Sequence, residues 1–201
     1  MIETPILIGS KIQLFPIRHF SSRRSLKTIL VVAVVFSILT AGIREKTESL
    51  IYKEYGDSVS ILFQKNEIPK SLKSIAEKSS KLRFMNNQIY LWKIMNNDLI
   101  KGIVILDNVK GKSQPITFAV FYDAEGQIRS SEIIKYREPI GGEVSNRYWL
   151  KQFLGKSWKS NYKVGKKIDG ISGATISVNA VTRGIHRSAF LAKYFLELND
   201  E

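Results

Sequence analysis

The sequence predicts an α+β fold, an antiparallel sheet of hairpins flanked by helices, preceded by one N-terminal transmembrane helix. Three features predict this arrangement. Two pairs of β-rich runs each enclose a turn sequence, amphipathic helical patterns stand before and after them, and an uncharged apolar run lies near the N-terminus. The length of 201 residues fits one domain with additional segments.

The apolar run is the strongest local signal. Residues 28–43, TILVVAVVFSILTAGI, carry no charged side chain. As a helix they span about 24 Å, and Lys27 and Arg44 extend that length by snorkelling. A buried helix of a soluble protein is disfavoured, because the run has no polar face. A cleaved signal peptide is the alternative, since basic residues precede the run and the small residues 40–42 end it. We favour an uncleaved anchor, because the 27 residues before the run make a long leader.

The charges beside this run predict the topology. Residues 1–27 contain five Lys and Arg against Glu3 alone, a net charge of +4, and positive flanks stay in the cytoplasm. With an anchor or a signal peptide alike, the chain from Arg44 onward lies outside the cytoplasm. We therefore expect a single-pass protein of the bacterial inner (cytoplasmic) membrane, with its folded domain on the periplasmic side.

The next segment predicts a helical lead-in to the sheet. Residues 44–55 form a charged juxtamembrane stretch with helical character, and residues 59–63 are a short strand candidate. Pro69 suits the first turn of a helix. In that helix four residues are expected to share the apolar face: Leu72, Ile75, Ala76 and Ser79.

Two hairpins are predicted after this helix. Residues 89–95 and 100–106 are β-rich and are separated by Asn96-Asn97-Asp98. Residues 116–122 and 128–136 flank Asp123-Ala124-Glu125-Gly126, which offers a glycine where φ is positive.

Two helices complete the prediction. After a loop at 137–144, Ser145 is expected to cap a helix that stacks Trp149 on Phe153 and Leu150 on Leu154, and Gly155 is expected to end it. The last helix begins near Thr175. Its apolar residues at helical spacing are Val178, Val181, Ile185, Ala189, Ala192 and Phe195.

The composition excludes several kinds of site. The chain has no Cys, so disulfides, thiolate metal sites and cysteine nucleophiles are excluded. His19 and His186 are far apart in the sequence, and no metal site is expected. The net charge of +13 suggests nucleic-acid binding, but the surplus beyond residue 27 is interpreted as scattered among acids, a solvated basic surface with no nucleic-acid partner.

Two Gly-Lys-Ser triplets, at residues 111–113 and 155–157, are interpreted as turns. A phosphate-binding loop needs a glycine five residues before the one that precedes Lys. Leu106 and Leu150 occupy those positions, so neither triplet fits.

The most informative stretch is residues 169–177, DGISGATIS, a glycine-rich loop that runs into the last helix. The N–H groups at a helix start are unpaired and carry the positive end of the helix dipole, so they favour a phosphate. Gly170 and Gly173 permit close approach of a ligand. From these residues alone, a phosphate site and a simple capped helix start are equally good interpretations.

This stretch resembles the flavinylation motif of the FMN-binding domain family, Asp-x-x-Ser/Thr-Gly-Ala-Thr. The family includes flavin-carrying subunits of the sodium-translocating NADH:quinone reductase and of the related Rnf complex, and regulators of nitrous oxide respiration. In this family a flavin transferase moves FMN from FAD onto the last Thr of the motif, here Thr175. The fixed positions are all present: Asp169, Ser172, Gly173, Ala174 and Thr175.

The resemblance extends over roughly residues 85–190. The run GKSQPITFAVFYDAEGQI resembles the family's Gly-Lys turn, central strand and hairpin. Residues 136–143, YREPIGGE, resemble the segment that follows, where many members carry Glu-Thr-x-Gly. Pro139 replaces that Thr, which puts any role of a hydroxyl there in doubt. The resemblance implies further cofactor contacts from Glu138, Gly141 and Gly142.

Four segments are expected on this basis. They are a cytoplasmic basic segment (1–27), the anchor (28–43), a juxtamembrane and helical lead-in (44–84) and the FMN-binding domain (85–201). The resemblance implies an electron-transfer flavoprotein with FMN bound covalently to Thr175, and no catalytic residue is assigned. An electron carrier or redox-complex subunit is favoured over a stand-alone enzyme. The alternatives are a flavin-dependent reductase with its own substrate, and a sensor or assembly subunit of a membrane redox complex.

The implied partners are a flavin transferase for maturation, a membrane redox partner of the cytochrome or quinone-reductase type, and the cytoplasmic membrane. Asp169 either helps the transferase to activate the hydroxyl or caps the loop through its own backbone. The aromatic residues Tyr148, Trp149 and Trp158 could stack on the flavin ring, but core packing explains them more readily.

Overall fold

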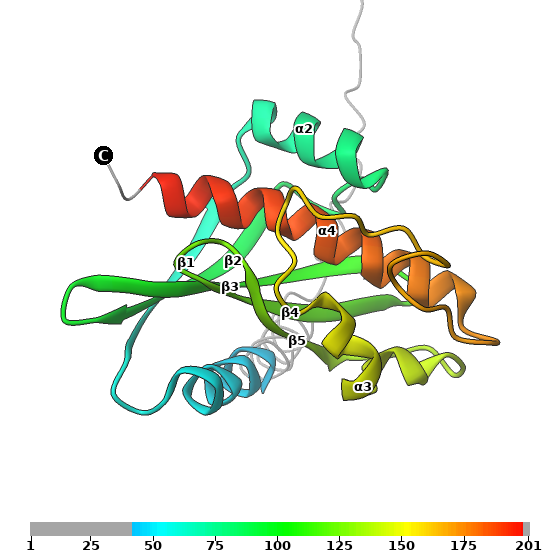
Figure 1. The fold of residues 1–201 in the computed structure, drawn as a ribbon, viewed down its shortest axis with the longest axis horizontal. Coiled ribbons are helices and arrows are strands. Elements are labelled where there is room, and N and C mark those ends of the chain that lie inside the picture. Colours follow the sequence, from blue (N-terminus) through cyan, green and yellow to red (C-terminus); the bar gives the residue numbers. More distant parts are fainter. Residues whose placement is uncertain (1–41, 199–201) are drawn as a thin grey trace, which may run out of the picture. The chain divides into compact units, whose positions relative to one another are not determined.

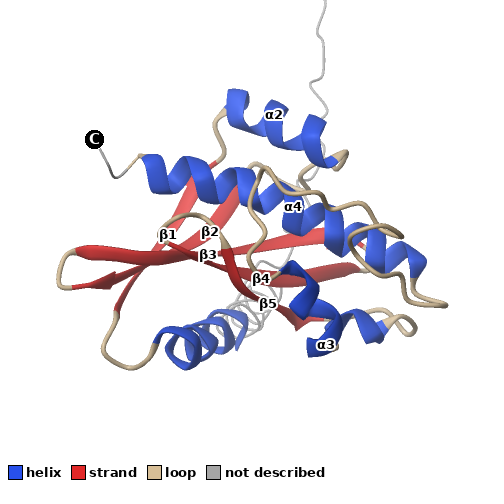
Figure 2. Cartoon of the chain, viewed as in Figure 1, coloured by secondary structure: helices blue, strands red, loops and turns tan. Residues whose placement is uncertain are grey.

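A five-stranded antiparallel sheet forms the centre of the fold, and its strand order follows the chain (Figure 2). The computed structural model describes residues 42–198. The strands are β1 (Ser60–Glu67), β2 (Gln88–Asn96), β3 (Leu99–Lys110), β4 (Pro115–Asp123) and β5 (Ile128–Lys135). The predicted antiparallel sheet flanked by helices is confirmed.

The predicted anchor, residues 28–43, lies outside the described residues apart from its last two. Between residues 42 and 198, no helix combines the length and the apolar character needed to cross a membrane. The lead-in at residues 44–84 belongs to the same compact unit as the sheet, Ala41–Glu201.

Both predicted hairpins are present. Asn97 and Asp98 join β2 to β3 with φ angles of 47° and 65°, the left-handed pair typical of a two-residue hairpin turn. Gly126, with φ of 76°, lies in the turn between β4 and β5. The register of β4 on β5 shifts twice, so this edge of the sheet carries irregularities that the alternating pattern did not predict.

The helix α4 (Thr175–Glu197) crosses one face of the sheet, with α2 (Lys70–Ser80) beside it (Figure 1). The larger hydrophobic core lies between α4 and the sheet. The helix approaches closely at Gly184, where an added Cβ would lie 2.5 Å from Cγ1 of Val109 and 2.9 Å from Cζ of Phe118. A buried contact of 2.6 Å between the hydroxyls of Tyr122 and Ser188 also links sheet and helix.

The helix α2 starts directly after Pro69, as predicted, but its buried face is narrower than expected. Ile75 is 55% exposed and Ser79 is exposed, so both predictions were wrong. The residues that it buries are Leu72, Ala76 and Ser80. Because α2 packs beside α4 rather than on the sheet, only one i, i+4 stripe makes contact.

Residues 42–55 are helical, as predicted, and the side chains of this helix join a second core on the opposite face of the sheet. Ile51 is fully buried there with Trp92 and Phe121. The Tyr55 hydroxyl donates a hydrogen bond of 2.7 Å to the carbonyl of Tyr122. The sheet is therefore covered on both faces.

Short helical segments follow the last strand: η1 (Gly142–Ser145), α3 (Arg147–Leu150) and η2 (Lys151–Phe153). The prediction that Ser145 is the cap was wrong. The cap is Asn146, whose side chain accepts a hydrogen bond of 2.8 Å from the backbone N–H of Tyr148. Ser145 instead ends η1, which the loop prediction for residues 137–144 did not include.

The packing of this region agrees in part with the prediction. Trp149 packs edge-on against Phe153, with ring centroids 5.3 Å apart. Leu154, expected to stack on Leu150, is 47% exposed. Gly155 has a φ of 68° and follows the last helical turn, as predicted.

The connection from residue 156 to residue 168 runs back along α4 (Figure 1). Tyr162 stacks on His186 with ring centroids 4.4 Å apart, and Trp158 lies against Phe190 at 5.8 Å. Burial lowers the pKa of His186. Stacking fixes the loop against α4, so the loop ends beside the start of that helix.

Candidate functional site

The loop at residues 169–174 is held by two backbone contacts at its beginning. The indole N–H of Trp149 donates to the carbonyl of Asp169 at 2.8 Å. The side-chain oxygen of Gln152 accepts a hydrogen bond of 2.7 Å from the backbone N–H of Asp169. Both partners come from the α3–η2 segment. The Asp169 side chain is exposed and makes no hydrogen bond with the described residues.

The loop ends at the first residue of α4. Ala174 is the N-cap residue, without a side-chain capping bond, and Thr175 is the first helical residue. The first helical hydrogen bond runs from the N–H of Val178 to Ala174. Among residues 42–198, the N–H groups of residues 175–177 have no partner. Three free donors and the positive helix end make this place suited to a phosphate.

The glycine before the helix leaves room for a ligand. Gly173 has a φ of 77°, which a β-branched residue adopts only under strain. No atom lies within 4 Å of the position that a Cβ would take at Gly173 or at Gly170. The loop therefore has an open outer side, and FMN phosphate fits the residues present.

The hydroxyl groups of this stretch differ in accessibility. Ser172 and Thr175 are exposed, whereas Ser177 is buried. The Ser177 hydroxyl lies 2.9 Å from that of Tyr136. Tyr136 donates its own proton to the carbonyl of Ile140 at 2.6 Å, so Ser177 is the donor to Tyr136. Ser177 is a structural residue of the first turn of α4.

The structure brings Gly141 to the same place. An added Cβ at Gly141 would lie 2.8 Å from the Tyr136 hydroxyl, 3.2 Å from Oγ of Ser177 and 3.4 Å from Cβ of Ala174. Gly141 has a φ of 88° and is buried. The segment after β5 therefore packs directly on the first turn of α4. Gly142, the next residue, starts η1 and is exposed.

Residues 111–189 match the family model described as the FMN-binding domain. The matched range starts before β4, includes residues 136–143 and ends within α4. The chain contains an FMN-binding domain. The match supports FMN as the cofactor, and the loop at residues 169–175 lies within the matched range.

The crystal structure of NqrC from Shewanella oneidensis is similar to this chain with a TM-score of 0.48 and 17% sequence identity. The superposition covers 72% of this chain and 86% of that chain. Among curated proteins, none matches this sequence.

Glu138, expected at the cofactor, faces another part of the FMN-binding domain. Its carboxylate accepts hydrogen bonds from the backbone N–H of Ser113 at 2.7 Å, the Ser113 hydroxyl at 2.8 Å and the backbone N–H of Gln114 at 2.9 Å. The backbone N–H groups of Gln114 and Ser113 lower the pKa of Glu138. Gly111 permits this contact, because a Cβ there would lie 2.4 Å from Oε1 of Glu138. Glu138 therefore closes the β3–β4 turn, and a cofactor contact stays a prediction.

The three aromatic candidates differ in position. Trp149 belongs to the core and is 7% exposed. Trp158 is half-buried against Phe190, and Lys193 lies 4.5 Å from the centre of its ring. Tyr148 is 82% exposed on α3. Core packing explains Trp149, as preferred, whereas Tyr148 has an exposed ring with Nζ of Lys151 5.5 Å from its centre.

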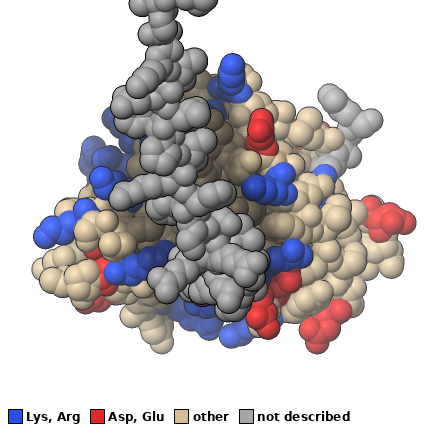
Figure 3. All heavy atoms as spheres, turned by 180° about the vertical axis from the view of Figure 1, so that it is seen from behind, with Lys and Arg blue, Asp and Glu red and all other residues tan. Residues whose placement is uncertain are grey.

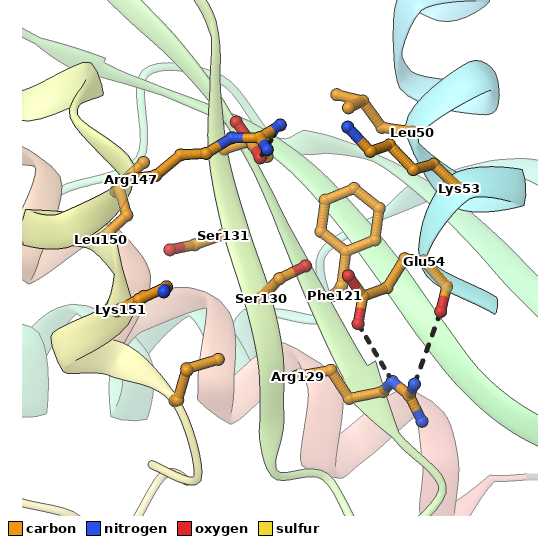
Figure 4. A pocket seen from close by; sticks show the side chains of 12 residues that line it. Leu50, Lys53, Glu54, Phe121, Arg129, Ser130, Ser131, Arg147, Leu150 and Lys151 are labelled. Carbon is orange, nitrogen blue, oxygen red and sulfur yellow. Dashed lines mark hydrogen bonds and ion pairs between the residues drawn. The ribbon is translucent and has the colours of Figure 1, made fainter.

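A cavity of about 270 Å³ lies apart from the predicted flavin residues, between the helix at 42–55, β5 and α3 (Figure 4). Arg129 is paired with Glu54 at 3.4 Å on one side of it, and Arg147 with Glu132 at 3.2 Å. None of the residues predicted to bind FMN lines this cavity. Within residues 42–198, no three His, Cys, Asp or Glu side chains are grouped to hold a metal ion.

The contacts that hold the site were not predicted. Trp149 binds the backbone carbonyl of Asp169, and Gln152 binds the backbone N–H of the same residue. Tyr136 binds the hydroxyl of Ser177. Each joins residues between 17 and 41 positions apart. No local pattern in the sequence indicates such pairs.

Proposed function

We propose that this protein is an electron-transfer flavoprotein whose FMN is linked through its phosphate to the Thr175 hydroxyl. The observation that carries the proposal is the position of Thr175, exposed at the first residue of α4, within a match to the FMN-binding domain. The alternative hydroxyl of Ser177 is buried and donates to Tyr136. Among the hydroxyls of the loop, Ser172 alone is comparably exposed.

The residues of the loop have separate parts in this proposal. The Thr175 oxygen forms the phosphoester, and its proton and AMP leave when a transferase uses FAD as the donor. The free N–H groups of residues 175–177 stabilise the phosphate charge. The exposed Asp169 carboxylate is available to the transferase, because the loop is held by the Asp169 backbone and not by its side chain.

Bound FMN supplies one- and two-electron chemistry. The chain holds the cofactor near its surface, because the attachment residue and the loop before it are exposed. Such a position favours exchange with a protein partner over an enclosed substrate pocket. We propose a membrane redox partner of the cytochrome or quinone-reductase type, with residues 28–43 as the anchor and the domain on the periplasmic side.

The test compares three variants expressed in full length with a flavin transferase and exported. Intact mass of the wild-type chain should increase by one FMN less one water, located on the Thr175 peptide. Thr175→Ala should fold, since Thr175 makes no capping bond. It should lose in-gel flavin fluorescence, because it lacks the hydroxyl that forms the proposed phosphoester. Thr175→Ser should keep at least partial labelling.

Ser172→Ala is the matched control, because it removes the other exposed hydroxyl of the loop. It should keep the fluorescence. Full fluorescence of Thr175→Ala, or its loss in Ser172→Ala alone, would place the bond on another residue. An unmodified wild-type chain under these conditions would contradict covalent attachment.

A further inference from the structure

The positive charge of the described chain is concentrated in one segment. Residues 144–196 contain ten Lys and Arg and a single acid, Asp169, a surplus of nine. Residues 42–143 contain sixteen Lys and Arg against thirteen Asp and Glu, a surplus of three. The surplus is therefore concentrated in this segment and is not spread evenly along the chain.

Most of these cations lie on α4 or on the loop that packs against it, whereas Arg147 and Lys151 line the cavity beside the helix at residues 42–55. The loop at residues 156–168 follows α4 toward residues 169–175 (Figure 1). A turn closed by hydrogen bonds from the N–H groups of Lys166 and Lys167 to the carbonyl of Lys163 presents three exposed lysines. This turn stands directly before Asp169. On the face seen from behind, basic and acidic side chains both occur (Figure 3).

Few acids neutralise these cations. Within residues 42–198, the ion pairs of the segment are Arg147 with Glu132, Arg187 with Asp107, and Lys193 with Glu197. The other seven make no ion pair within that range. Lys151 lines the cavity at α3 and Lys156 is half-buried over the ring of Tyr162, and we call the other five the basic strip. They are Lys159, Lys163, Lys166, Lys167 and Arg183.

We propose that the basic strip is the docking surface for an acidic face of the protein that exchanges electrons with the FMN. This inference rests on the proposed function. The strip adjoins the loop that ends at Thr175, so a partner held there lies beside the flavin. Opposite charges steer encounter and set orientation, which a short-lived redox complex needs. Phospholipids do not exchange electrons with a flavin, so binding of lipid would not require the strip to lie beside it. A redox protein does require this position, and we therefore favour a protein partner.

The first experiment does not depend on flavin. Full-length chain in zwitterionic nanodiscs is titrated with an acidic [2Fe–2S] ferredoxin as the probe. The triple variant Lys163→Glu/Lys166→Glu/Lys167→Glu should weaken binding at least about tenfold. The matched control, Lys65→Glu/Lys78→Glu/Lys101→Glu, changes the net charge equally at exposed lysines of β1, α2 and β3, and should weaken it much less. Equal losses would show that only net charge matters and would overturn the proposal.

The second experiment reads the flavin. Reoxidation of the reduced flavin by ferricyanide, a trivalent anion, should slow as salt is raised, and hexaammineruthenium(III), a trivalent cation, should show the opposite trend. The strip variant should weaken or reverse both trends, while the control variant follows the wild type. Unchanged trends in the strip variant would overturn docking beside the flavin.

These experiments distinguish a failure of the proposed flavin function from a failure of the proposed docking surface. A chain without flavin contradicts the proposed function, yet the ferredoxin titration still decides the strip. Vesicles of anionic phospholipid serve as the third probe. If the strip variant loses vesicle binding but keeps ferredoxin binding, the surface binds lipid and the protein-docking proposal is wrong.

Discussion

At the scale of single residues, the charge of Glu138 supports the turn between β3 and β4. Its carboxylate accepts three hydrogen bonds from Ser113 and Gln114, two of them from backbone N–H groups. The acid is partly exposed, so the contact is screened by water. The same turn precedes β4, a strand against which α4 packs. Glu138 therefore stabilises the domain at the β3–β4 turn, away from the loop at 169–175.

The pH dependence of this contact is predictable. The pKa of Glu138 is lowered in the folded protein, so its contribution to stability is present above the unfolded pKa and is lost as pH falls through the folded pKa. Glu138→Gln should lower the melting temperature at pH 7. The difference from wild type should shrink below about pH 4, the usual range of a Glu pKa.

Thermal melts of both proteins at pH 7, 5 and 3 measure this. Glu125→Gln is the control, since this residue makes no hydrogen bond or ion pair within residues 42–198. A difference between wild type and Glu138→Gln that is constant with pH would show that the charge has no part in the turn.

Residue-level prediction from sequence worked where the signal was local. The loop from Asp169 to Thr175 was found because glycines, hydroxyls and the helix start follow one another in the chain. Its supports were not found, because Tyr136 reaches Ser177 across 41 positions. For Glu138 the resemblance predicted a cofactor contact, which stays a prediction, and it did not predict the hydrogen bonds of its carboxylate to Ser113 and Gln114.

At the scale of elements, the start and the apolar spacing of α4 followed from the sequence, whereas its distance from the sheet did not. Gly184 is inside the helix, where glycine costs about 0.5–1 kcal/mol relative to Ala. The structure explains the glycine by the closeness of Val109 and Phe118, both almost fully buried. The predictions of the buried face of α2 and of the cap at Ser145 were wrong for a similar reason. The local sequence allows more than one buried face and more than one cap, and tertiary contacts determine which of them forms.

The glycine can be tested directly. Gly184→Ala should destabilise the domain by about 1–3 kcal/mol despite the better helix propensity of Ala, because the added methyl meets a packed core. Arg183→Ala, at the exposed neighbouring position, should change stability by about 0.5 kcal/mol or less. Urea denaturation of both variants gives the comparison, and increased stability of Gly184→Ala would contradict the close approach of α4 to the sheet.

At the scale of the whole molecule, the sheet needs both of its covers. The sequence predicted helices before and after the strands, and it predicted a helical stretch at residues 44–55. It did not predict that this stretch packs on the sheet, since its charged composition suggested a juxtamembrane segment. The structure places Ile51 in a core with Trp92 and Phe121 and seats the Tyr55 hydroxyl on β4. The same helix that follows the expected anchor is therefore part of the domain.

Two truncations and a pair of point variants test this cover. A chain that starts at residue 42 should melt cooperatively, because it keeps every element of the second core. A chain that starts at residue 57 should lose stability and expose Trp92, whose indole N–H also donates to Glu48 at 3.0 Å. Near-UV circular dichroism and thermal melts distinguish the two. Within the longer chain, Ile51→Ala should cost about 2–5 kcal/mol, since it leaves a cavity at a fully buried site.

The expected fall in melting temperature for Ile51→Ala is about 5–20 °C for a domain of this size. Lys53→Ala, on the exposed side of the same helix, should stay within about 2 °C of wild type. Thr175 starts α4, which packs on the other face of the sheet, so the proposed labelling at Thr175 should survive in any variant that still folds at the growth temperature. Equal stability of the chains starting at 42 and at 57 would show that residues 42–55 only link the domain to the segment before them, and that the boundary expected at residue 85 describes the folding unit better.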